Sequence, residues 1–375
     1  MPEDSTNHKM SVLIILYNNI KVLLYAVVQS PKKTKECKSM DKNILKLSAK
    51  IPVMLLGAPG IGKSAVVTQF AEEFGADLVD IRLSAETPSS FEGKDYISPQ
   101  TGDLQKARAW WLQRIDRNRA EDTPTVLFFD EYTNAPDALQ QLAYAPFNER
   151  KLHGVSFDYT LKSGQPGLYV FGAGNRVEDE TGAREMVYAS KTRVFTVDFP
   201  VSSKDWLLWA EENNVHPKIR AFILANPDAL LEKPSTGTAC PREWVNLSYA
   251  LDAGIPYADA AHGTIRGAHE AKFCAFFKDS ALCPTIEDIV TGQATPQSEV
   301  HLSAFTATLA AALKEDERAI EHFPPVYRWI AEQSAECEII FAKYAIEFLN
   351  TRLIASPECM AVLKSAASKI GMHVK

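Results

Sequence analysis

A glycine-rich stretch near residue 60 carries the residue types that hold phosphate groups. Residues 57–64 read GAPGIGKS, which matches the spacing G-x-x-x-x-G-K-S of a phosphate-binding loop. Glycines let the backbone curl around a phosphate with its N–H groups pointing inward, and a helix that starts at the loop adds its positive end. Lys63 would reach the β- and γ-phosphates of a nucleotide, and the Ser64 hydroxyl would bind Mg²⁺. The residues that we expect to contact the nucleotide are Gly57, Ala58, Pro59, Gly60, Ile61, Gly62, Lys63, Ser64 and Ala65.

A pair of carboxylates ends an apolar segment about 70 residues further along the chain. Residues 125–131 read TVLFFDE, so a buried strand would end in Asp130 and Glu131. The carboxyl ends of parallel strands share the edge of the sheet where ligands bind, which would place both side chains beside the phosphate loop. Asp130 would then hold Mg²⁺ together with Ser64, and Glu131 would act as general base on an attacking water. The pair therefore favours hydrolysis over transfer of phosphate to a small molecule.

A third strand pattern ends in an amide. Residues 169–176 read YVFGAGNR, and Asn175 follows the apolar part. Its side chain could orient the attacking water and contact the γ-phosphate. Gly-Asn is also a common turn pair, so an ordinary turn is the alternative. The position of Asn175 after the two earlier motifs favours the functional interpretation.

These motifs need a parallel sheet to bring them together. Apolar runs alternate with helical patterns over the first half of the chain, and this alternation predicts an α/β fold, a P-loop NTPase parallel sheet sandwiched by helices. Residues 84–103, rich in Ser, Pro and Gly, predict an irregular insertion. The predicted strands are 51–56, 77–83, 125–129, 168–173 and 193–199, and the predicted helices between them are 64–74, 104–119 and 135–150.

From about residue 203 onward the patterns are helical and are separated by Pro and Gly. They lie at 206–213, 216–225, 242–253, 257–277, 302–313, 326–349 and 358–370. We therefore expect an α/β domain followed by an all-α lid and C-terminal helices. The predicted parts are an N-terminal extension at 1–39, a nucleotide-binding domain at 40–200, a helical lid at 201–286 and a C-terminal helical region at 287–375.

The two ends of the chain leave alternatives open. The run 12–28 is apolar, but Asn18, Asn19 and Lys21 interrupt it, which makes a membrane span costly and favours a hairpin or helix on the core. Met40 precedes an amphipathic segment that leads into the first strand, so residues 1–39 could be dispensable. Near the other end, the helical stripe of Phe305, Leu309 and Leu313 is interpreted as core, with a partner-docking surface as the alternative.

Composition excludes several classes of function. The formal net charge is −7, which argues against indiscriminate nucleic-acid binding because that needs a basic footprint. Six cysteines form no CxxC pair and have no histidine at zinc-finger spacing, and the chain lacks HExxH. We interpret them as free thiols of a reducing cytosol and expect a cytoplasmic protein.

The order of these motifs resembles the AAA+ ATPases, and within them the MoxR-like, dynein-related branch. The chain is similar to that family from about residue 40 to residue 290. A phosphate loop occurs in many families, whereas the whole ordered series is specific. The stretches that carry the resemblance are GAPGIGKS, DIRLSAETPSSFEG, TVLFFDEYTNAPDALQQLAYAPFNERKLHG, FGAGNR, SKTRVFTVDFP, DWLLWAEENNVHP and CPREWVNLSYAL.

The resemblance implies a role for each matching residue. Lys63 and Ser64 correspond to Walker A, Asp130 and Glu131 to Walker B, and Asn175 to sensor 1. It further implies that Arg193 is an arginine finger that reaches the ATP of a neighbouring subunit and that Arg242 is sensor 2 on the lid. Arg176 and Arg184 compete for the finger role, and Arg150 matches a basic position at the subunit interface.

A finger acting on a neighbour implies a closed ring, and the family implies a homo-hexamer that uses ATP and Mg²⁺. The expected output is remodelling of a protein client, with a von Willebrand A-domain protein as the possible partner. The alternatives are a nucleic-acid-associated motor or restriction-type NTPase and an inactive ATP-binding scaffold, against which the intact Glu131 argues. Phe91 in Phe-Glu-Gly resembles an aromatic pore loop, but a single packed phenylalanine is the preferred interpretation.

Overall fold

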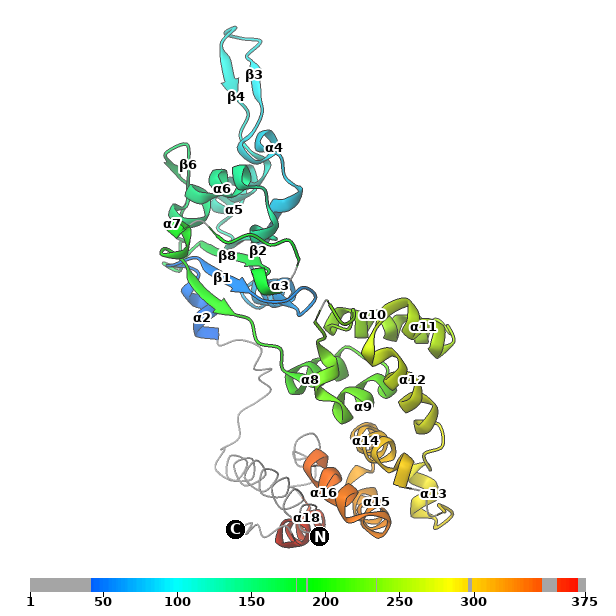
Figure 1. Cartoon of the computed structure of the whole chain (residues 1–375). Coiled ribbons are helices and arrows are strands. Elements are labelled where there is room, and N and C mark those ends of the chain that lie inside the picture. The colour runs from blue at the N-terminus through cyan, green and yellow to red at the C-terminus, as the bar shows by residue number, and fades with distance from the viewer. Residues whose placement is uncertain are drawn as a thin grey trace, which may run out of the picture.

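The chain folds into an α/β domain followed by a helical body (Figure 1). The structure is a computed structural model that describes residues 42–345, apart from 180, 187, 234 and 296–298, and residues 356–369. The predictions for residues 1–39, including the alternative of a membrane segment at 12–28, lie outside these described residues. Within them, none of the helices combines the length and the apolar character that crossing a bilayer requires.

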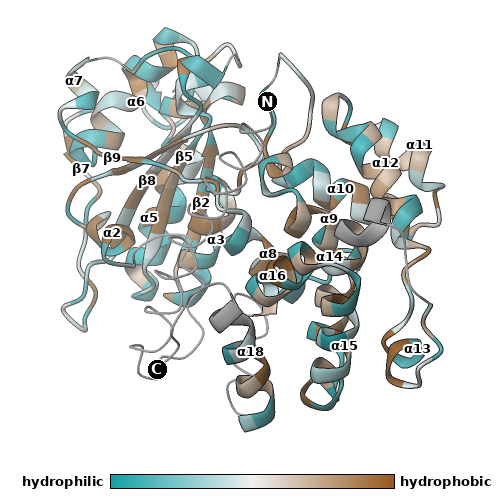
Figure 2. Cartoon of the chain, turned by 60° about the horizontal axis from the view of Figure 1, so that its bottom comes forward, coloured by the Kyte–Doolittle hydropathy of each residue, from teal (hydrophilic) through white to brown (hydrophobic). Residues whose placement is uncertain are grey.

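The α/β domain is built on a five-stranded parallel sheet, as the alternating pattern predicted. The two strands β5 and β8 are buried along their whole length because helices cover both faces of the sheet. Figure 2 shows their hydrophobic residues enclosed by the surrounding helices. In spatial order, the strands are β2 (Asp77–Arg82), β5 (Thr125–Asp130), β8 (Leu168–Gly174), β1 (Val53–Leu56) and β9 (Phe195–Asp198).

Two separate hydrophobic clusters fix the helices to the sheet. On one face, Phe70 of α3 (Lys63–Glu73) packs with the sheet residues Val126 and Phe171, beside α2 (Lys42–Leu47). On the other face, α5 (Trp110–Glu121) and α6 (Asp137–Glu149) bury their apolar stripes against the sheet. The motifs at the carboxyl ends of the strands are thereby held on a rigid platform. The remaining short elements of the domain are α7 (Tyr188–Lys191), β6 (Lys151–Leu152) and β7 (Val155–Ser156).

The prediction of an irregular insertion at 84–103 was wrong. Thr87 and Ser90 form a capping box that starts α4 (Pro88–Glu92), and the chain then enters a hairpin of β3 (Asp95–Ile97) and β4 (Leu104–Lys106). The hairpin projects from the domain (Figure 1). Phe91 is fully buried and its ring lies near those of Trp111 and Phe129, so the preferred interpretation as a packed phenylalanine is confirmed.

The predicted helix at 104–119 also starts later than expected, at Trp110. Leu104 pairs with Ile97 across the hairpin, which takes residues 104–106 into a strand. Gly93 closes the base of the hairpin with φ +94°, and a β-carbon there would lie 1.8 Å from the Ala107 carbonyl oxygen. Only glycine fits this close approach, and it fixes where the hairpin returns to the domain.

The helical body begins at Ser203, and two helices that the pattern predicted as single are broken. Gly267, with φ +122°, separates α11 from α12, and Ser334, in an extended conformation, separates α15 from α16. The described helices are α8 (Ser203–Glu212), α9 (Pro217–Ala225), α10 (Pro241–Asp252), α11 (Tyr257–Thr264), α12 (Ala268–Ser280), α13 (Ile286–Val290), α14 (Glu299–Glu315), α15 (Ala319–Gln333), α16 (Ala335–Tyr344) and α18 (Pro357–Lys369).

One continuous hydrophobic cluster runs through this body, from Trp206 on α8 to Cys359 on α18. The predicted stripe of Phe305, Leu309 and Leu313 lies inside it and is at most 1% exposed, so its interpretation as core is confirmed. Arg220 on α9 forms an ion pair with Glu315 on α14, which ties the two helices together at the edge of the cluster. The five described cysteines are free thiols, as predicted: Cys240, Cys274, Cys283, Cys337 and Cys359.

Candidate active site

A cavity of about 760 Å³ lies at the carboxyl-terminal edge of the sheet, between the α/β domain and the helical body. Residues 59–66 form one wall, and the ends of β2, β5 and β8 form the floor. The segment after β9 and residues of α8 and α10 form the opposite wall. This is the place where open α/β sheets bind ligands.

The predicted phosphate loop forms its wall as the motif requires. Pro59 and the residues up to Ala65 line the cavity, whereas Gly57 and Ala58 turn their carbonyl groups toward Lys63. Gly62 has φ +101° and precedes the first turn of α3, and no side chain caps that turn. The helix therefore presents its N–H groups, and its positive dipole end, toward the cavity.

Lys63 is the buried cation of the site, with 9% of its surface exposed. Its Nζ donates hydrogen bonds to the carbonyl oxygens of Gly57, at 2.6 Å, and Ala58, at 2.8 Å. Burial lowers the pKa of Lys63 from 10.5 to about 8, and the nearby carboxylate of Asp130 opposes this shift. The side chain is thus held where an anionic ligand would replace its protein acceptors and favour its charged form.

Ser64 and Asp130 meet at the floor of the cavity. The Ser64 hydroxyl donates to Oδ2 of Asp130 at 3.0 Å, and both residues line the cavity. Mg²⁺ in nucleotide sites is held by one or two protein oxygens while phosphates and water complete its shell. The described residues contain no group of three or more His, Cys, Asp or Glu that could hold an ion without a ligand. A hydroxyl beside a carboxylate fits the magnesium chemistry predicted for this pair.

Glu131 also lines the cavity, in a left-handed backbone conformation with φ +54°. Its carboxylate accepts a hydrogen bond from the Ser84 hydroxyl, and its Oε1 lies 3.9 Å from Nε of Arg82. These two partners of the predicted base were missed at the sequence level. Arg82 pairs in register with Asp130 across β2 and β5. Only the knowledge that β2 lies beside β5 would have pointed to them.

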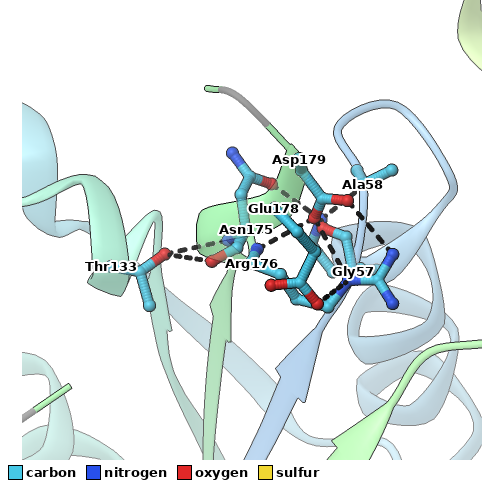
Figure 3. Close-up of polar contacts among 8 residues, drawn as sticks. Gly57, Ala58, Thr133, Asn175, Arg176, Glu178 and Asp179 are labelled. Atoms are coloured by element: carbon cyan, nitrogen blue, oxygen red, sulfur yellow. Dashed lines mark hydrogen bonds and ion pairs between the residues drawn. The ribbon is translucent and has the colours of Figure 1, made fainter. Parts of the chain in front are cut away.

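Asn175 directly follows β8 at the same edge, where the Thr133 side chain fixes it (Figure 3). The backbone N–H of Asn175 donates to Oγ1 of Thr133 at 2.8 Å, and that hydroxyl donates to the carbonyl oxygen of Asn175 at 2.9 Å. Its Oδ1 accepts from Lys63 at 3.1 Å, while its Nδ2 donates to Asn134 at 3.1 Å. The structure therefore brings Asn175 into the site, as predicted, with its amide oxygen next to the lysine.

The helical body closes over the phosphate loop at Arg242, the first-turn arginine of α10. Its backbone N–H donates to the carbonyl oxygen of Gly60 at 3.1 Å, and its exposed side chain lines the cavity. Gly60 has φ +73°, and a β-carbon there would lie 2.7 Å from Sγ of Cys240. The loop and the lid are thus in direct contact through Arg242.

The aromatic wall of the cavity was missed at the sequence level. Trp206 and Trp209 of α8 and Tyr249 of α10 line the side away from Asp130. Their spacing predicts only a helical pattern, since every third or fourth residue of a packed helix is apolar. Asp80 of β2 also lines the cavity, and burial, with a smaller contribution from the Asp130 carboxylate, raises its pKa.

Two arginines that competed for the finger role are paired with carboxylates of their own domain. Arg176 donates to Asp179, with Nη2 3.1 Å from Oδ1, and this pair lies beside the phosphate loop (Figure 3). Nη1 of Arg184 lies 2.7 Å from Oδ1 of Asp137. Among the residues that line the cavity in the described part of the chain, neither arginine occurs.

Arg193 is exposed and likewise lies outside the lining of its own cavity in the described structure. Its guanidinium donates to the Tyr144 hydroxyl and, at 3.2 Å, to the carbonyl oxygen of Ala189. The basic position at Arg150 forms an intrachain ion pair, with Nη1 3.1 Å from Oδ2 of Asp158. Any catalytic contact of Arg193 would therefore have to be made with another subunit.

Comparisons with known proteins agree with this geometry. Residues 52–194 match the family model described as AAA domain (dynein-related subfamily). A segment of 79 residues is 32% identical to Protein SAV of Sulfolobus acidocaldarius, and it covers 21% of this chain but only 8% of that protein.

Solved structures resemble the chain weakly. NtrX from Brucella abortus in complex with ADP is 13% identical, with a TM-score of 0.37, over 100% of this chain and 74% of that one. A mutant of RuvB from Thermotoga maritima is 14% identical, with a TM-score of 0.33, over 72% of this chain and 81% of that one. The assignment of the domain therefore rests on the strand order and the family match, and not on these solved structures. Residues 52–194 form an AAA ATPase domain of the dynein-related subfamily.

Proposed function

We propose that this chain uses ATP with Mg²⁺, assembles into a closed ring of identical subunits, and couples hydrolysis to the remodelling or assembly of a protein client. The observation that carries the proposal is the meeting of three motifs at one cavity. Lys63 contacts Asn175, Ser64 contacts Asp130, and Glu131 lines the same space. An inactive scaffold would have no need for an intact carboxylate beside the phosphate loop.

The residues of the site divide the chemistry among themselves. Lys63 would exchange the carbonyl oxygens of Gly57 and Ala58 for phosphate oxygens and neutralise their charge. Ser64 and Asp130 would hold Mg²⁺, which when bound neutralises charge that develops on the phosphates. Glu131 would accept a proton from water as that water attacks the γ-phosphorus, and the Asn175 amide would orient it.

The position of Arg193 supports the proposed ring. It lies on the surface of its own domain, so an arginine finger at this residue needs a neighbour whose cavity it can enter. Head-to-tail contacts of this kind close into a ring when the rotation permits, and we propose six subunits by analogy with the MoxR-like ATPases. The finger would stabilise charge on the γ-phosphate in the transition state.

The output would come from the helical body. Arg242 contacts Gly60 through its backbone, and its side chain lines the cavity. Loss of the γ-phosphate would therefore change the contacts of α10 directly. A swing of this body against the α/β domain would act on a client. We propose a protein client, with a von Willebrand A-domain partner as the first candidate, because the acidic net charge of −7 disfavours nucleic acid.

The test is affinity capture with Glu131→Gln, which keeps the shape of the base but cannot accept the proton. This variant should bind ATP without hydrolysing it and so hold its partners. Lys63→Met, which should not bind ATP well, is the matched control. Recovery of a protein partner with Glu131→Gln, but not with Lys63→Met, supports the proposal. Recovery of nucleic acid alone would overturn the choice of a protein client.

A further inference from the structure

Arg193 is held in place by a neighbour that no motif singles out. Its Nη1 donates a hydrogen bond to the hydroxyl of Tyr144 on α6, and its guanidinium carbon lies 5.5 Å from the centre of the Tyr144 ring. The same phenol therefore offers both an acceptor oxygen and an aromatic face to the cation. The carbonyl oxygen of Ala189 accepts a further hydrogen bond, at 3.2 Å.

The backbone at Arg193 is connected, through α7, to α6, the helix that carries Tyr144. The N–H of Arg193 donates to the carbonyl oxygen of Ser190, at 3.0 Å, at the end of α7. Asn148, one turn beyond Tyr144 on α6, donates both to the Tyr144 carbonyl oxygen, at 2.9 Å, and to the Ser190 hydroxyl, at 3.2 Å. Ser190 is 1% exposed, and this brace between α6 and α7 is partly buried. Tyr144 and Arg193 thus stand on one rigid support.

The partners of Arg193 differ in charge from those of the other two arginines. Arg176 and Arg184 each pair with a carboxylate, which would compete with a phosphate for the guanidinium. The contacts that hold Arg193 in the described structure are a neutral hydroxyl and a carbonyl group. These neutral acceptors can orient the side chain while leaving its positive charge available for an anion.

We propose that Tyr144 is a positioning residue that preorganises Arg193 for the active site of the neighbouring subunit. The inference rests on the proposed trans role of Arg193. Long exposed arginines sample many rotamers, and a finger that arrives already oriented loses less conformational freedom when it engages the transition state. Tyr144 acts through Arg193 and touches no substrate itself. Its hydroxyl therefore matters on the subunit that supplies the finger, and not on the subunit that hydrolyses ATP.

The experiment exploits this asymmetry by mixing full-length subunits. Glu131→Gln subunits supply Arg193 but do not hydrolyse ATP, and Arg193→Ala subunits hydrolyse only when a neighbour supplies the arginine. The ATPase rate should fall by about a thousandfold in Arg193→Ala alone and by at least about a hundredfold in Glu131→Gln alone. An equal mixture should restore activity at about a quarter of the junctions, because subunits combine at random around the ring.

Tyr144→Phe is then placed on one partner at a time. On the Glu131→Gln donor it should lower the activity of the mixture roughly threefold to tenfold, the value of one hydrogen bond. On the Arg193→Ala acceptor it should have no effect. In the otherwise intact chain it should lower kcat by the same factor with KM for ATP unchanged. Tyr257→Phe, on a ring stacked against Phe277 far from this region, is the matched control and should change nothing.

The outcomes separate the two hypotheses. If the mixture recovers no activity, or if Arg193→Ala alone is as active as the unmodified chain, the trans finger of the proposed function is wrong. If the mixture recovers but Tyr144→Phe has no effect on the donor, the finger stands and Tyr144 does not position it. An equal loss on donor and acceptor would show that Tyr144 only supports the fold, which also overturns the proposal. The thermal unfolding midpoint of Tyr144→Phe should match that of the unmodified chain.

Discussion

Nζ of Lys63 lies 3.1 Å from Oδ1 of Asn175, although 112 residues separate the two along the chain. They meet because β1, which leads into the phosphate loop, pairs with β8, which ends at Gly174, directly before Asn175. The lysine therefore donates its hydrogen bonds to protein oxygens, which phosphate oxygens would replace. Nucleotide binding would therefore replace the hydrogen-bond acceptors of one buried cation, Lys63. Substitution of this residue tests that exchange.

Replacement of Lys63 by methionine should weaken ATP binding. The substitution keeps the apolar stem and removes the charge-assisted hydrogen bonds, which are worth roughly tenfold to a hundredfold in Kd. Because burial disfavours the charged form of this lysine, Lys63→Met should not lower the stability of the nucleotide-free protein. Titration calorimetry gives Kd, and Lys50→Met, at an exposed lysine, is the control. An unchanged Kd would contradict the site.

ATP affinity should also depend on pH through Lys63. Burial lowers the pKa of this group to about 8, so the free protein loses the charge as pH rises through that value. Binding ATP above pH 8 requires the proton to be taken up again, and Kd should rise by up to about tenfold per pH unit until the pKa of the complex is reached.

The lowered pKa of Lys63 also makes stability depend on pH. Stability should increase with pH, whereas ATP affinity should decrease. Between pH 8 and 10.5 the unfolded chain holds the Lys63 proton while the folded chain has released it, so the cost of burying this group shrinks and stability increases as pH rises. Both trends should be absent in Lys63→Met, as measured by calorimetry and thermal unfolding across this range. Persistence of the full pH dependence of Kd in that variant would assign it to another group.

Gly60→Ala should disturb the contact between the phosphate loop and the lid. Gly60 combines φ +73° with a close approach, since a β-carbon would lie 2.7 Å from Sγ of Cys240 and 3.2 Å from Cβ of Arg242. Gly75 has φ +58° but open space around it, so Gly75→Ala shares the backbone strain of about 1–2 kcal/mol without the clash. We expect ATPase activity to fall at least about tenfold more in Gly60→Ala than in Gly75→Ala, from the added steric cost.

Steady-state phosphate release measures this difference, and Cys240→Ala in the Gly60→Ala background should recover part of the activity by removing the nearest atom. Equal losses in Gly60→Ala and Gly75→Ala would mean that backbone strain alone, and not lid contact, limits this position.

The predicted parts of the fold are those that local pattern determines. The strands β1 and β8 are short apolar runs next to glycine, and the alternation of strands with helices admits few topologies. The hairpin after Gly93 could not be predicted because residues 95–97 and 104–106 are exposed and follow no apolar pattern. The break at Gly267 was hidden because the apolar residues on both sides continue one helical pattern.

The site, like the fold, contains residues that local pattern predicts and residues that it does not. Lys63, Asp130 and Asn175 follow strands and were found from their positions, whereas Ser84 and Arg82 became visible only through the contact of β2 with β5. Roles that depend on a second subunit, such as the one proposed for Arg193, have no signal in the geometry of one chain beyond the absence of Arg193 from the lining that its own described residues provide.

Removal of the C-terminal helices should destabilise the lid. Phe305 of α14 and Phe341 of α16 belong to the same hydrophobic cluster as Trp244 of the lid helix α10. A chain that ends after residue 295 would expose that cluster, at about 2 kcal/mol or more for each large side chain left in water. We expect loss of a cooperative transition in thermal unfolding and increased binding of a hydrophobic dye. A shortened chain with the unmodified midpoint would show that the lid and the C-terminal region are independent domains.

Phosphate release from the purified chain with ATP and Mg²⁺, compared with Glu131→Gln under conditions where both bind ATP, measures whether this site hydrolyses ATP. We expect turnover by the unmodified chain and a loss of at least about a hundredfold in Glu131→Gln, since a general base contributes that much or more. Equal rates for the two proteins, or rates at background for both, would contradict the assignment of Glu131 as the base of an ATP-hydrolysing site.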